Sequence, residues 1–461
     1  MRNYLTAPLI VDFNITRRCN LTCQYCYANA GTAENKNELT FEEIKTILDQ
    51  LKELNVLIVR LSGGEPLIRT DYKEIVDYCE ELGFLLCTNT NGTMITDDII
   101  NCFKKDCFRK IGISLDSYKE NVHNSIRGKE YAFNNTMNSI RKIVEEGLAD
   151  KLSVVITLSN ENANVDEIEK FLHFLGKSGI KNVAFQYAIP VGRGDHFDNC
   201  SPDYDKWKEL IVWLYSNEDT IREELGIAYV VNLTNESGCK FELFFPFIES
   251  GRKDLLSSVP GAMSSEINPY ISCQAGNSTV AITADGKVYP CELMMCYEKL
   301  EAGDLREYTF KEIWNNSNVL RTIRNMKVDD LDGFCTKCSM KDICGGGCRA
   351  SAYAYSKKIN GCDIRCNRVK ESVDCHSEII DYQGIKIVVR KEMKSYYFTN
   401  PNTLKMYNMN QIGFIIFKGL INRIEKNTII EQIVNECKIK EDVAVNEYER
   451  FSTCFIKEFK I

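Results

Sequence analysis

Strand-like apolar segments alternate with helix-period segments from Leu9 to Ile189, and this alternation restricts the fold more than any other feature. The intervening segments have the 3.6-residue period of helices, and several begin with Thr or Asp and end near Gly, as helix caps require. The strand candidates are Leu9–Ile15, Val56–Leu61, Phe84–Thr90, Lys110–Leu115, Leu152–Leu158 and Val183–Ile189. Six β/α repeats predict an α/β fold with a parallel sheet, either open or curled into a partial (β/α)6 TIM barrel.

Length and charge narrow the class of protein further. A chain of 461 residues is too long for one compact core, and we expect about two or three domains. The net charge of −8 and the pI near 5.4 argue against binding to nucleic acid or to an anionic membrane surface. The start of the chain has no apolar signal core, and no apolar run approaches the ~18 residues of a membrane span. We therefore predict a cytoplasmic protein.

Cysteine is the unusual component, with 21 residues against four histidines. In a reducing cytosol, clustered cysteines bind metal or perform redox chemistry more often than they form disulfides. Because the histidines are few and scattered, thiolates must carry any metal, which favours zinc or iron–sulfur.

Three of these cysteines lie close together directly after the first predicted strand, at Cys19, Cys23 and Cys26. A structural zinc ion takes four ligands and a disulfide takes two, so three close thiolates suggest a metal site with one open position. Reactive groups of parallel sheets gather at the C-terminal ends of the strands, which is where this loop begins.

Polar segments also follow the next strands. The second strand ends in "SGGEP" (Ser62–Pro66), the third in "TNTNG" and the fourth in "ISLDS". Gly63 and Gly64 allow close approach of the backbone to a ligand, and Glu65 can accept a hydrogen bond from an ammonium group.

These motifs together resemble the radical S-adenosylmethionine (SAM) superfamily. Its C-x3-C-x2-C signature, with an aromatic residue before the last cysteine, stands here as Cys19, Cys23, Tyr25 and Cys26. The resemblance covers roughly Leu9–Gly194 and includes Gly63–Pro66, the "SLD" of the fourth strand, "HNSIRG" (His123–Gly128) and "PVGRG" (Pro190–Gly194).

The resemblance implies that the three thiolates bind three irons of a [4Fe–4S] cluster and that SAM binds the fourth iron. One electron from the cluster would then cleave SAM to a 5′-deoxyadenosyl radical. The residues implied at the cofactor site are Tyr25, Gly63, Gly64, Glu65, Pro66, Asn91, Ser114 and Arg127. The first alternative is a zinc knuckle formed by the three thiols. The second is a purely structural or capping role for Asn91, Ser114 and Arg127.

A second cysteine-rich region spans Cys273–Cys375. It contains "CTKCSMKDICGGGC", a C-x2-C-x5-C-x3-C pattern whose glycines supply backbone N–H groups near cluster sulfurs. This region resembles the SPASM domain of peptide-modifying radical SAM enzymes, with "DGKVYPC" and "GDLREYTFKEIW" in the usual places. Two structural zinc sites are the alternative.

The SPASM resemblance implies two auxiliary clusters, and so three [4Fe–4S] clusters in all. The outer cluster would bind Cys335, Cys338, Cys344 and Cys366, and the inner one Cys273, Cys291 and Cys348. The fourth position of the inner cluster is either Cys296 or open to substrate. The remaining cysteines are expected to be small buried hydrophobic residues: Cys79, Cys87, Cys102, Cys107, Cys200, Cys239, Cys362, Cys375, Cys437 and Cys454.

The C-terminal region has a different pattern, with three short predicted strands followed by three amphipathic helices. This order predicts a small winged-helix-like α+β domain, and its nearly balanced charge argues against DNA binding. The region resembles the peptide recognition element typified by the small chaperone of pyrroloquinoline quinone biosynthesis, called PqqD-like, which binds a leader peptide at a sheet edge.

Four regions follow from these patterns. They are a barrel (5–195), a bridging region (196–268), a SPASM domain (269–375) and a peptide recognition element (379–461). In the bridging region, the aromatic "FELFFPFIES" segment either covers the barrel or lines a substrate cleft.

The resemblances imply a radical SAM peptide maturase that forms a thioether or other cross-link in a ribosomally made precursor. Its partners would be the leader of that precursor and an electron donor such as flavodoxin or ferredoxin. The alternatives are a sulfatase-maturating type that makes formylglycine and a leader-binding protein without catalytic activity.

Overall fold

The chain forms two compact units, residues 1–366 and residues 367–461. The computed structural model describes residues 4–32, 37–196, 200–231, 246–258, 269–271, 273–366, 376–382, 385–392, 395–399, 406–437 and 439–459. None of the described helices is long and apolar enough to cross a membrane.

The first unit contains a ten-stranded sheet in the order β10-β9-β8-β1-β2-β3-β4-β5-β6-β7. Its central strands are β1 (Ile10–Thr16), β2 (Ile58–Gly63), β3 (Leu85–Thr90), β4 (Phe108–Ser114), β5 (Leu152–Leu158) and β6 (Asn182–Tyr187). These six strands are parallel and consecutive, which confirms the predicted partial barrel.

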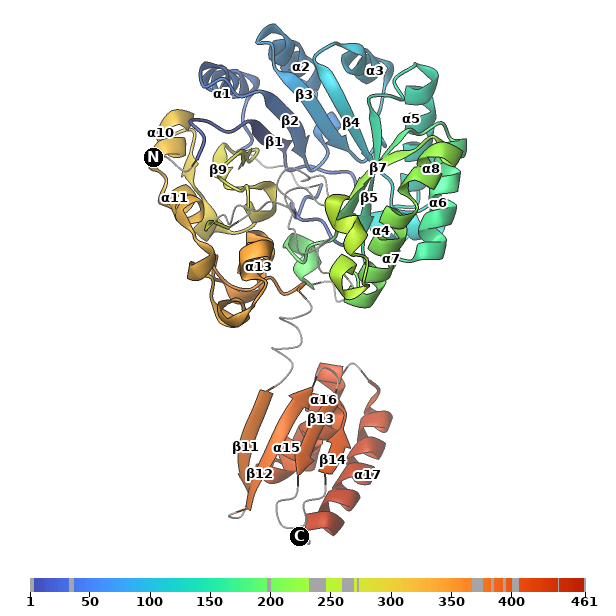
Figure 1. The fold of residues 1–461 in the computed structure, drawn as a ribbon, viewed down its shortest axis with the longest axis vertical. Coiled ribbons are helices and arrows are strands. Elements are labelled where there is room, and N and C mark those ends of the chain that lie inside the picture. Colours follow the sequence, from blue (N-terminus) through green and yellow to red (C-terminus); the bar gives the residue numbers. More distant parts are fainter. Residues whose placement is uncertain are drawn as a thin grey trace. The chain divides into compact units, whose positions relative to one another are not determined.

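Helices cover the outer face of this sheet (Figure 1). They are α1 (Phe41–Glu53), α2 (Tyr72–Glu81), α3 (Asp97–Lys104), α5 (Ala132–Glu145) and α6 (Val165–Lys177). A further helix, α4 (Glu120–Arg127), follows β4 and contacts the cysteine loop. Helix caps occur at predicted helix starts. Thr40 forms a capping box with Glu43 at α1, and Thr96 accepts a hydrogen bond from the Ile99 N–H at α3.

The two faces of β1 differ in polarity because side chains alternate along a strand. Val11, Phe13 and Ile15 are completely buried in the core beneath the helices. The other face carries Asp12 and Asn14, each 4% exposed. The interior of the barrel is therefore polar on this strand, unlike a packed apolar core.

The sheet extends beyond the six predicted strands on both sides. On one side, β7 (Ala228–Val231) pairs parallel to β6. On the other, β8 (Thr279–Ile282) pairs parallel to β1 and continues through the antiparallel strands β9 (Lys287–Tyr289) and β10 (Gly303–Asp304). The cysteine-rich region thus shares its sheet with the barrel.

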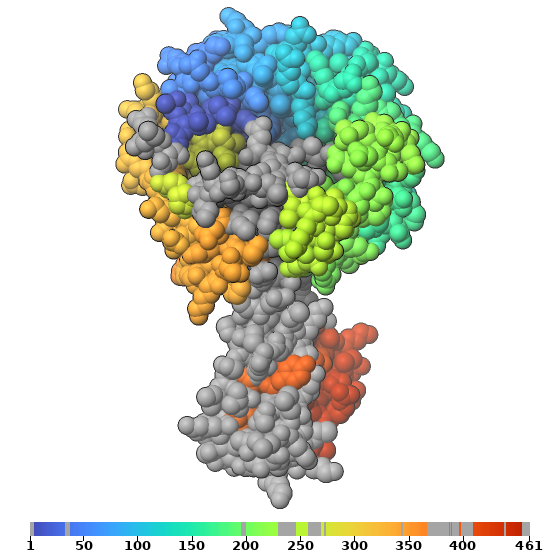
Figure 2. Space-filling model, in the orientation of Figure 1, coloured from blue at the N-terminus to red at the C-terminus, as the bar shows by residue number. Residues whose placement is uncertain are grey.

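The cysteine-rich region contains the helices α10 (Phe310–Asn316), α11 (Asn318–Asn325), α12 (Lys341–Cys344) and α13 (Arg349–Ser356). Of these, α10 packs on α1 of the barrel. Arg306, just before α10, donates to Glu43 of α1 at 2.8 Å, and the Phe310 N–H donates to Gln50 at 2.7 Å. In Figure 2 the yellow-orange surface of this region accordingly borders the blue surface of the N-terminal part.

The bridging region is more regular than the sequence pattern indicates. It contains α7 (Tyr204–Ser216), α8 (Glu218–Leu225) and the edge strand β7. In the aromatic segment, Phe247 is completely buried and its ring packs on Tyr215 at 5.1 Å. The burial of Phe247 favours the interpretation that this segment covers the barrel. Residues 241–245 lie outside the described part.

The second unit contains a four-stranded antiparallel sheet in the order β11-β12-β13-β14. The strands are β11 (His376–Tyr382), β12 (Ile385–Glu392), β13 (Ser395–Thr399) and β14 (Met406–Met409). The prediction of three strands was wrong by one, because β11 precedes the first predicted strand. The three predicted helices are α15 (Gln411–Ile421), α16 (Lys426–Cys437) and α17 (Glu441–Phe459).

Because the second unit has its own core, damage to it should leave the first unit intact. Ile416 is completely buried between helices of this unit, whereas Ile424 is 39% exposed. We expect Ile416→Ala to destabilise the second unit by about 2–5 kcal/mol, and Ile424→Ala to have little effect. Denaturant titration with probes in each unit measures this; equal losses in both variants would contradict it.

Candidate functional site

The three-cysteine loop starts where β1 ends, at the C-terminal edge of the sheet. Cys19 and Cys23 are 7% and 8% exposed, and Cys26 is half-buried. Three other segments, two at strand ends and one at the end of a helix, hold the backbone of this loop in place.

The first segment is the Gly-Gly-Glu turn after β2. The Gly64 N–H donates to Thr16 O, and the Glu65 N–H donates to Arg18 O, both at 2.8 Å. A Cβ on Gly63 would lie 2.3 Å from Thr16 O, and one on Gly64 would lie 2.3 Å from Arg18 O. Both positions therefore require glycine, because the turn contacts the backbone of the residues before Cys19. The sequence had suggested only a close approach to a ligand.

The second segment is the C-terminal end of α4, within the "HNSIRG" motif. The Thr22 N–H donates to Arg127 O at 3.2 Å, and the Gln24 N–H donates to Ile126 O at 3.1 Å. Gly128 ends the helix in the left-handed region, at φ +73°, with Thr22 Oγ1 2.3 Å from the position of a Cβ.

The third segment is the "PVGRG" turn after β6. Arg193 donates from Nε to Cys23 O at 2.9 Å and from Nη1 to Ala30 O at 2.5 Å, and its own N–H donates to Cys26 O at 3.0 Å. One residue, Arg193, thus binds three carbonyls of the cysteine loop through its side chain and its backbone.

Polar groups approach the cysteine sulfurs themselves. Asn91 Nδ2 lies 4.0 Å from Cys19 Sγ, and Arg127 Nη1 lies 3.8 Å from Cys23 Sγ. Burial raises the pKa of the Cys19 thiol to about 12 and also raises that of Cys23. Without a bound cation these thiols stay protonated at neutral pH, so thiolate formation depends on the metal.

The residues predicted to contact SAM gather around this loop, but several already have protein partners. Glu65 is completely buried, and its carboxylate accepts from Thr90 Oγ1 at 2.6 Å and from the Asn91 N–H at 2.7 Å. Burial raises the pKa of Glu65 to about 7 despite these hydrogen bonds. Asn91 donates to Asn20 at 2.9 Å and accepts from Thr93 Oγ1 at 2.6 Å.

Arg127 forms a buried ion pair with Asp116, with Nε and Oδ2 2.6 Å apart. The ring of Tyr25 lies 5.6 Å from its guanidinium carbon. Ser114 is half-buried at the end of β4, and Pro66 is buried in the short helix η1 (Pro66–Ile68). The SAM contacts of these residues stay predictions.

Sequence reasoning missed the supporting residues. Arg193 and Asp116 lie inside motifs that the sequence singled out, but their partners are distant in the chain. Asn20 and Thr93 gave no signal, because their roles arise only when the ends of β1 and β3 meet.

The polar interior of the barrel carries charged side chains that connect to the cysteine-rich region; Asp12 is buried, and Arg60 and Glu292 are half-buried. Arg60 pairs with Asp12 across β1 and β2. Tyr27, next to Cys26, donates to Glu292 Oε2 at 3.1 Å. Burial and the nearby Asp12 raise the pKa of Glu292 to about 7. These groups lie between the three-cysteine loop and Cys291.

The predicted inner auxiliary ligands lie together. Cys348 and Cys273 are close enough that each thiolate would raise the pKa of its neighbour, and Cys291 interacts with both. Cys296, by contrast, is exposed, and its thiol lies 3.9 Å from Leu293 O.

In the outer set, Cys362 lies beside a predicted ligand. Cys335 interacts with Cys344, and Cys344 with Cys366, but Cys335 is also hydrogen-bonded to Cys362. Cys362 was expected to be a buried hydrophobic residue, yet it is half-buried and accepts a hydrogen bond from Cys335 that lowers its pKa. It is a further candidate ligand.

The other cysteines are mostly placed as expected. Four are buried, and Cys87 and Cys437 are half-buried. The side chains of Cys239, Cys375 and Cys454 lie outside the described part. The buried cysteines are Cys79, Cys102, Cys107 and Cys200.

Across the described residues, no three Cys, His, Asp or Glu side chains converge on one point as ligands of a single ion would. A four-iron cluster makes a different demand, because each thiolate binds its own iron and the ligands surround a volume. The three-cysteine loop, with two buried thiols, a half-buried third and polar donors near two of the sulfurs, fits such a cluster.

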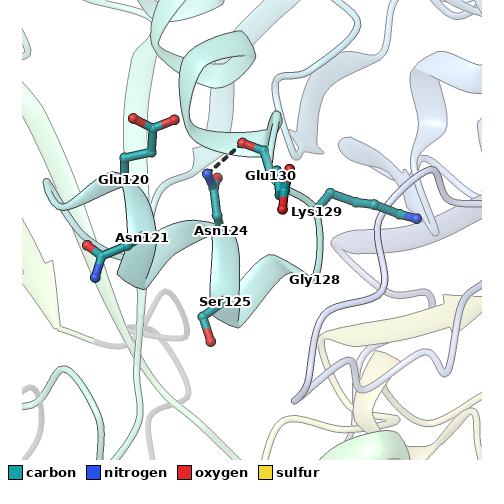
Figure 3. Close-up of a pocket in the computed structure, with 7 residues that line it drawn as sticks. All are labelled: Glu120, Asn121, Asn124, Ser125, Gly128, Lys129 and Glu130. Carbon is teal, nitrogen blue, oxygen red and sulfur yellow. Dashed lines mark hydrogen bonds between the residues drawn. The ribbon is translucent and has the colours of Figure 1, made fainter.

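A surface hollow of about 870 Å³ lies on α4 beside the cysteine loop (Figure 3). It is lined by polar side chains, and Asn124 donates to Glu130 O at 2.6 Å within it. Gly128 belongs both to its wall and to the contact with Thr22. No cysteine lines it, so we do not assign SAM to this hollow.

Family models match two parts of the chain. Residues 13–175 match the Radical SAM superfamily, and residues 273–339 match the SPASM iron–sulfur cluster-binding domain. The chain belongs to the radical SAM superfamily and carries a SPASM domain. Its cofactors are accordingly a [4Fe–4S] cluster, SAM and auxiliary iron–sulfur clusters, and it is a SAM-dependent enzyme. The number of three clusters stays a prediction.

The characterised relatives include a heme synthase and a peptide maturase. The chain is 28% identical over 353 residues to the AdoMet-dependent heme synthase of Methanosarcina barkeri, covering 76% of this chain and 93% of the relative. It is also 28% identical over 365 residues to the mycofactocin maturase MftC of Mycolicibacterium smegmatis, covering 78% and 83%.

Solved structures share the fold. The crystal structure of Streptococcus suis SuiB bound to its precursor peptide SuiA has a TM-score of 0.62 at 19% identity, covering 79% of this chain and 77% of that one. The structure of anSMEcpe with bound AdoMet has a TM-score of 0.58 at 17% identity, covering 79% and 95%.

The close backbone approach at Gly64 leads to a test of the loop. Gly64→Ala places a methyl group against Arg18 O and should displace the cysteine loop, whereas Gly31→Ala in the same loop meets open space. We expect lower iron content per chain after anaerobic reconstitution for Gly64→Ala and unchanged iron for Gly31→Ala. Normal iron content in the Gly64 variant would refute the positioning role.

Proposed function

We propose that this enzyme matures a ribosomally synthesised precursor peptide, most simply by forming a thioether or another cross-link. The observation that carries the proposal is the separate C-terminal unit. It combines an antiparallel sheet, whose edge strands are β11 and β14, with three helices. A sheet edge pairs with the main chain of an incoming peptide, and pockets beside it select alternate side chains.

The cofactor sites of this proposal are built from the residues described above. The thiolates of Cys19, Cys23 and Cys26 hold the SAM-binding cluster, and the turn around Gly63–Pro66 lies next to the open corner. When bound, this cluster and SAM supply a 5′-deoxyadenosyl radical that abstracts hydrogen from an unactivated carbon. The two cysteine sets of the SPASM region hold the auxiliary clusters, with Cys362 as an added candidate in the outer set.

The chain's own residues orient the reaction and exclude water. The Asp116–Arg127 pair and the Glu65–Thr90 hydrogen bond keep the walls of the site rigid. The polar interior at Asp12, together with Glu292, faces the space between the cysteine loop and the inner auxiliary set and would contact the substrate. Desolvation there strengthens every polar contact with the substrate.

Three alternatives remain distinct from this proposal. A sulfatase-maturating-type enzyme would modify Cys or Ser to formylglycine and needs no leader-binding unit. A heme synthase is favoured by the extent of the Methanosarcina barkeri match, which spans 93% of that relative. A leader-binding protein without catalysis conflicts with the intact cysteine loop. The precursor, reached through its leader, and a flavodoxin or ferredoxin as electron donor are the proposed partners.

The metal content of the site is directly measurable. With three [4Fe–4S] clusters, the reconstituted chain should bind about twelve irons. Replacing Cys19, Cys23 and Cys26 by Ala should remove about four of them and abolish reductive SAM cleavage, because the cluster loses its only ligands. Cys79→Ala, a buried cysteine away from all three sets, is the control and should keep full iron. Zinc without labile sulfide would overturn the assignment.

Deletion of the C-terminal unit distinguishes peptide maturation from the alternative functions. Deleting residues 367–461 should leave cluster loading and uncoupled SAM cleavage unchanged, because the whole unit and no part of the first is removed. Micromolar binding of the precursor, roughly −8 kcal/mol, and efficient modification should be lost together. Titration with a Cys-rich peptide encoded in a neighbouring reading frame, followed by mass spectrometry, measures both.

The full-length enzyme with a leaderless precursor is the matched control and should show the same defect as the truncated enzyme with the full precursor. If the truncated enzyme modifies the full precursor as well as the intact chain does, the unit does not bind the leader. A heme-synthase or sulfatase-type role would then be favoured.

A further inference from the structure

Arg349 is a completely buried arginine in the cysteine-rich region, directly after Cys348. Its guanidinium donates only to backbone carbonyls. Nε donates to Gly347 O at 3.3 Å, and Nη1 donates to Gly361 O at 2.8 Å and to Ile359 O at 3.2 Å. Nη2 donates to Gly346 O. Within the described part of the chain, it forms no ion pair with a carboxylate.

Two other buried arginines of the same unit have a carboxylate partner. Arg127 pairs with Asp116 at 2.6 Å, and Arg365 pairs with Asp363 at 2.8 Å. A third, Arg324, donates to backbone carbonyls as Arg349 does. A guanidinium stays protonated in proteins, and a buried charge costs several kcal/mol unless an opposite charge or strong dipoles compensate it. Four carbonyl dipoles stabilise Arg349, so no carboxylate among the described residues cancels its positive charge.

The three glycines that precede Cys348 form a loop around the guanidinium of Arg349. Gly345, Gly346 and Gly347 all have positive φ, of +66°, +88° and +74°, a conformation that only glycine adopts readily in succession. This backbone turns the carbonyls of Gly346 and Gly347 toward the guanidinium. A Cβ on Gly346 would lie 3.1 Å from Arg349 Nη2.

Arg349 also lies between the two cysteine sets. Its backbone N–H hydrogen-bonds the thiol of Cys273 in the inner set. Its positive charge opposes the rise in the pKa that burial causes at Cys273 and at Cys344. It acts in the same direction on Cys335. One buried cation is thus close to thiols of both sets.

We propose that Arg349 is the resident counter-charge of both auxiliary iron–sulfur clusters and raises their reduction potentials. This inference rests on the ligand sets proposed above. A cluster with thiolate ligands carries net negative charge, and one-electron reduction adds another. A nearby fixed cation stabilises the reduced state more than the oxidised state, so Arg349 makes both clusters easier to reduce. Arg349 is a positioning residue and takes no electron itself.

The test uses the full chain with Cys19, Cys23 and Cys26 replaced by Ala, so that only auxiliary clusters contribute to the signal. Redox titration followed by electron paramagnetic resonance gives their potentials without any substrate. We expect Arg349→Gln to shift both potentials to more negative values, and Arg349→Lys, which keeps the charge, to restore them. Unchanged potentials in Arg349→Gln would overturn the proposal.

Arg324→Gln is the matched control. Arg324 is 2% exposed and donates to the carbonyls of Gly276 and Trp314, both at 2.6 Å, but interacts with no cysteine. This variant should leave both potentials unchanged; a shift equal to that of Arg349→Gln would mean a general effect of unfolding and would overturn the proposal.

If Arg349→Gln does not bind its auxiliary clusters, their potentials cannot be measured, and iron content is compared between the two variants instead. The proposal then expects Arg349→Lys to retain auxiliary iron and its potential, and loss of iron in both variants would show that hydrogen-bond geometry matters and not charge. Absence of auxiliary iron in the parent chain would instead refute the ligand sets, independently of Arg349 and of the substrate.

Discussion

The hydrogen bonds from the Gly64 and Glu65 N–H groups to the carbonyls of Thr16 and Arg18 tie the end of β2 to the first residues of the cysteine loop. The position of the cysteine loop depends on this contact, because Cys19 directly follows Arg18 in the chain. The two backbones approach so closely that no side chain fits at either glycine. A loop with buried thiols cannot rely on its own packing, since unligated thiols contribute little, and it therefore needs such backbone hydrogen bonds.

From this contact, a buried polar network spreads across the strand ends. Glu65 binds Thr90 and the backbone of Asn91, and Asn91 in turn reaches Asn20 and the sulfur of Cys19. Burying these groups costs free energy unless each has a partner, so the network is stable only when all its members are in place. The same residues that sequence motifs associate with SAM therefore also hold the loop together. A variant of Glu65 would therefore disturb the loop in addition to the predicted SAM contact, so iron content and SAM affinity must be measured separately.

The repeated pattern of the sequence was sufficient for the barrel but not for its edges. Each of the six strands carries a period-2 or continuous apolar signal, and helix caps such as Thr40 mark the boundaries. The strands β7, β8, β9, β10 and β11 were not predicted. The first four are only two to four residues long, and strands this short are defined more by their neighbours than by their own residues. The cysteine spacing identified most of the ligand candidates, but Cys362 was expected to be a buried hydrophobic residue. Its proximity to Cys335 depends on how the chain folds back after α13, and no local pattern encodes that return.

The pairing of β8 with β1 links the two metal-binding regions mechanically. Cys19 follows β1, Cys273 precedes β8, and Cys291 follows β9, so one continuous sheet fixes candidate ligands of two different clusters. Electron transfer and substrate positioning between clusters require constant distances, and a hydrogen-bonded sheet supplies them better than a flexible domain interface. Glu292 and Tyr27 bridge the same two regions through the barrel interior. The polar inner face of the barrel, closed on one side by this shared sheet, is therefore the part of the molecule in which a substrate would meet both the cysteine loop and the inner auxiliary set.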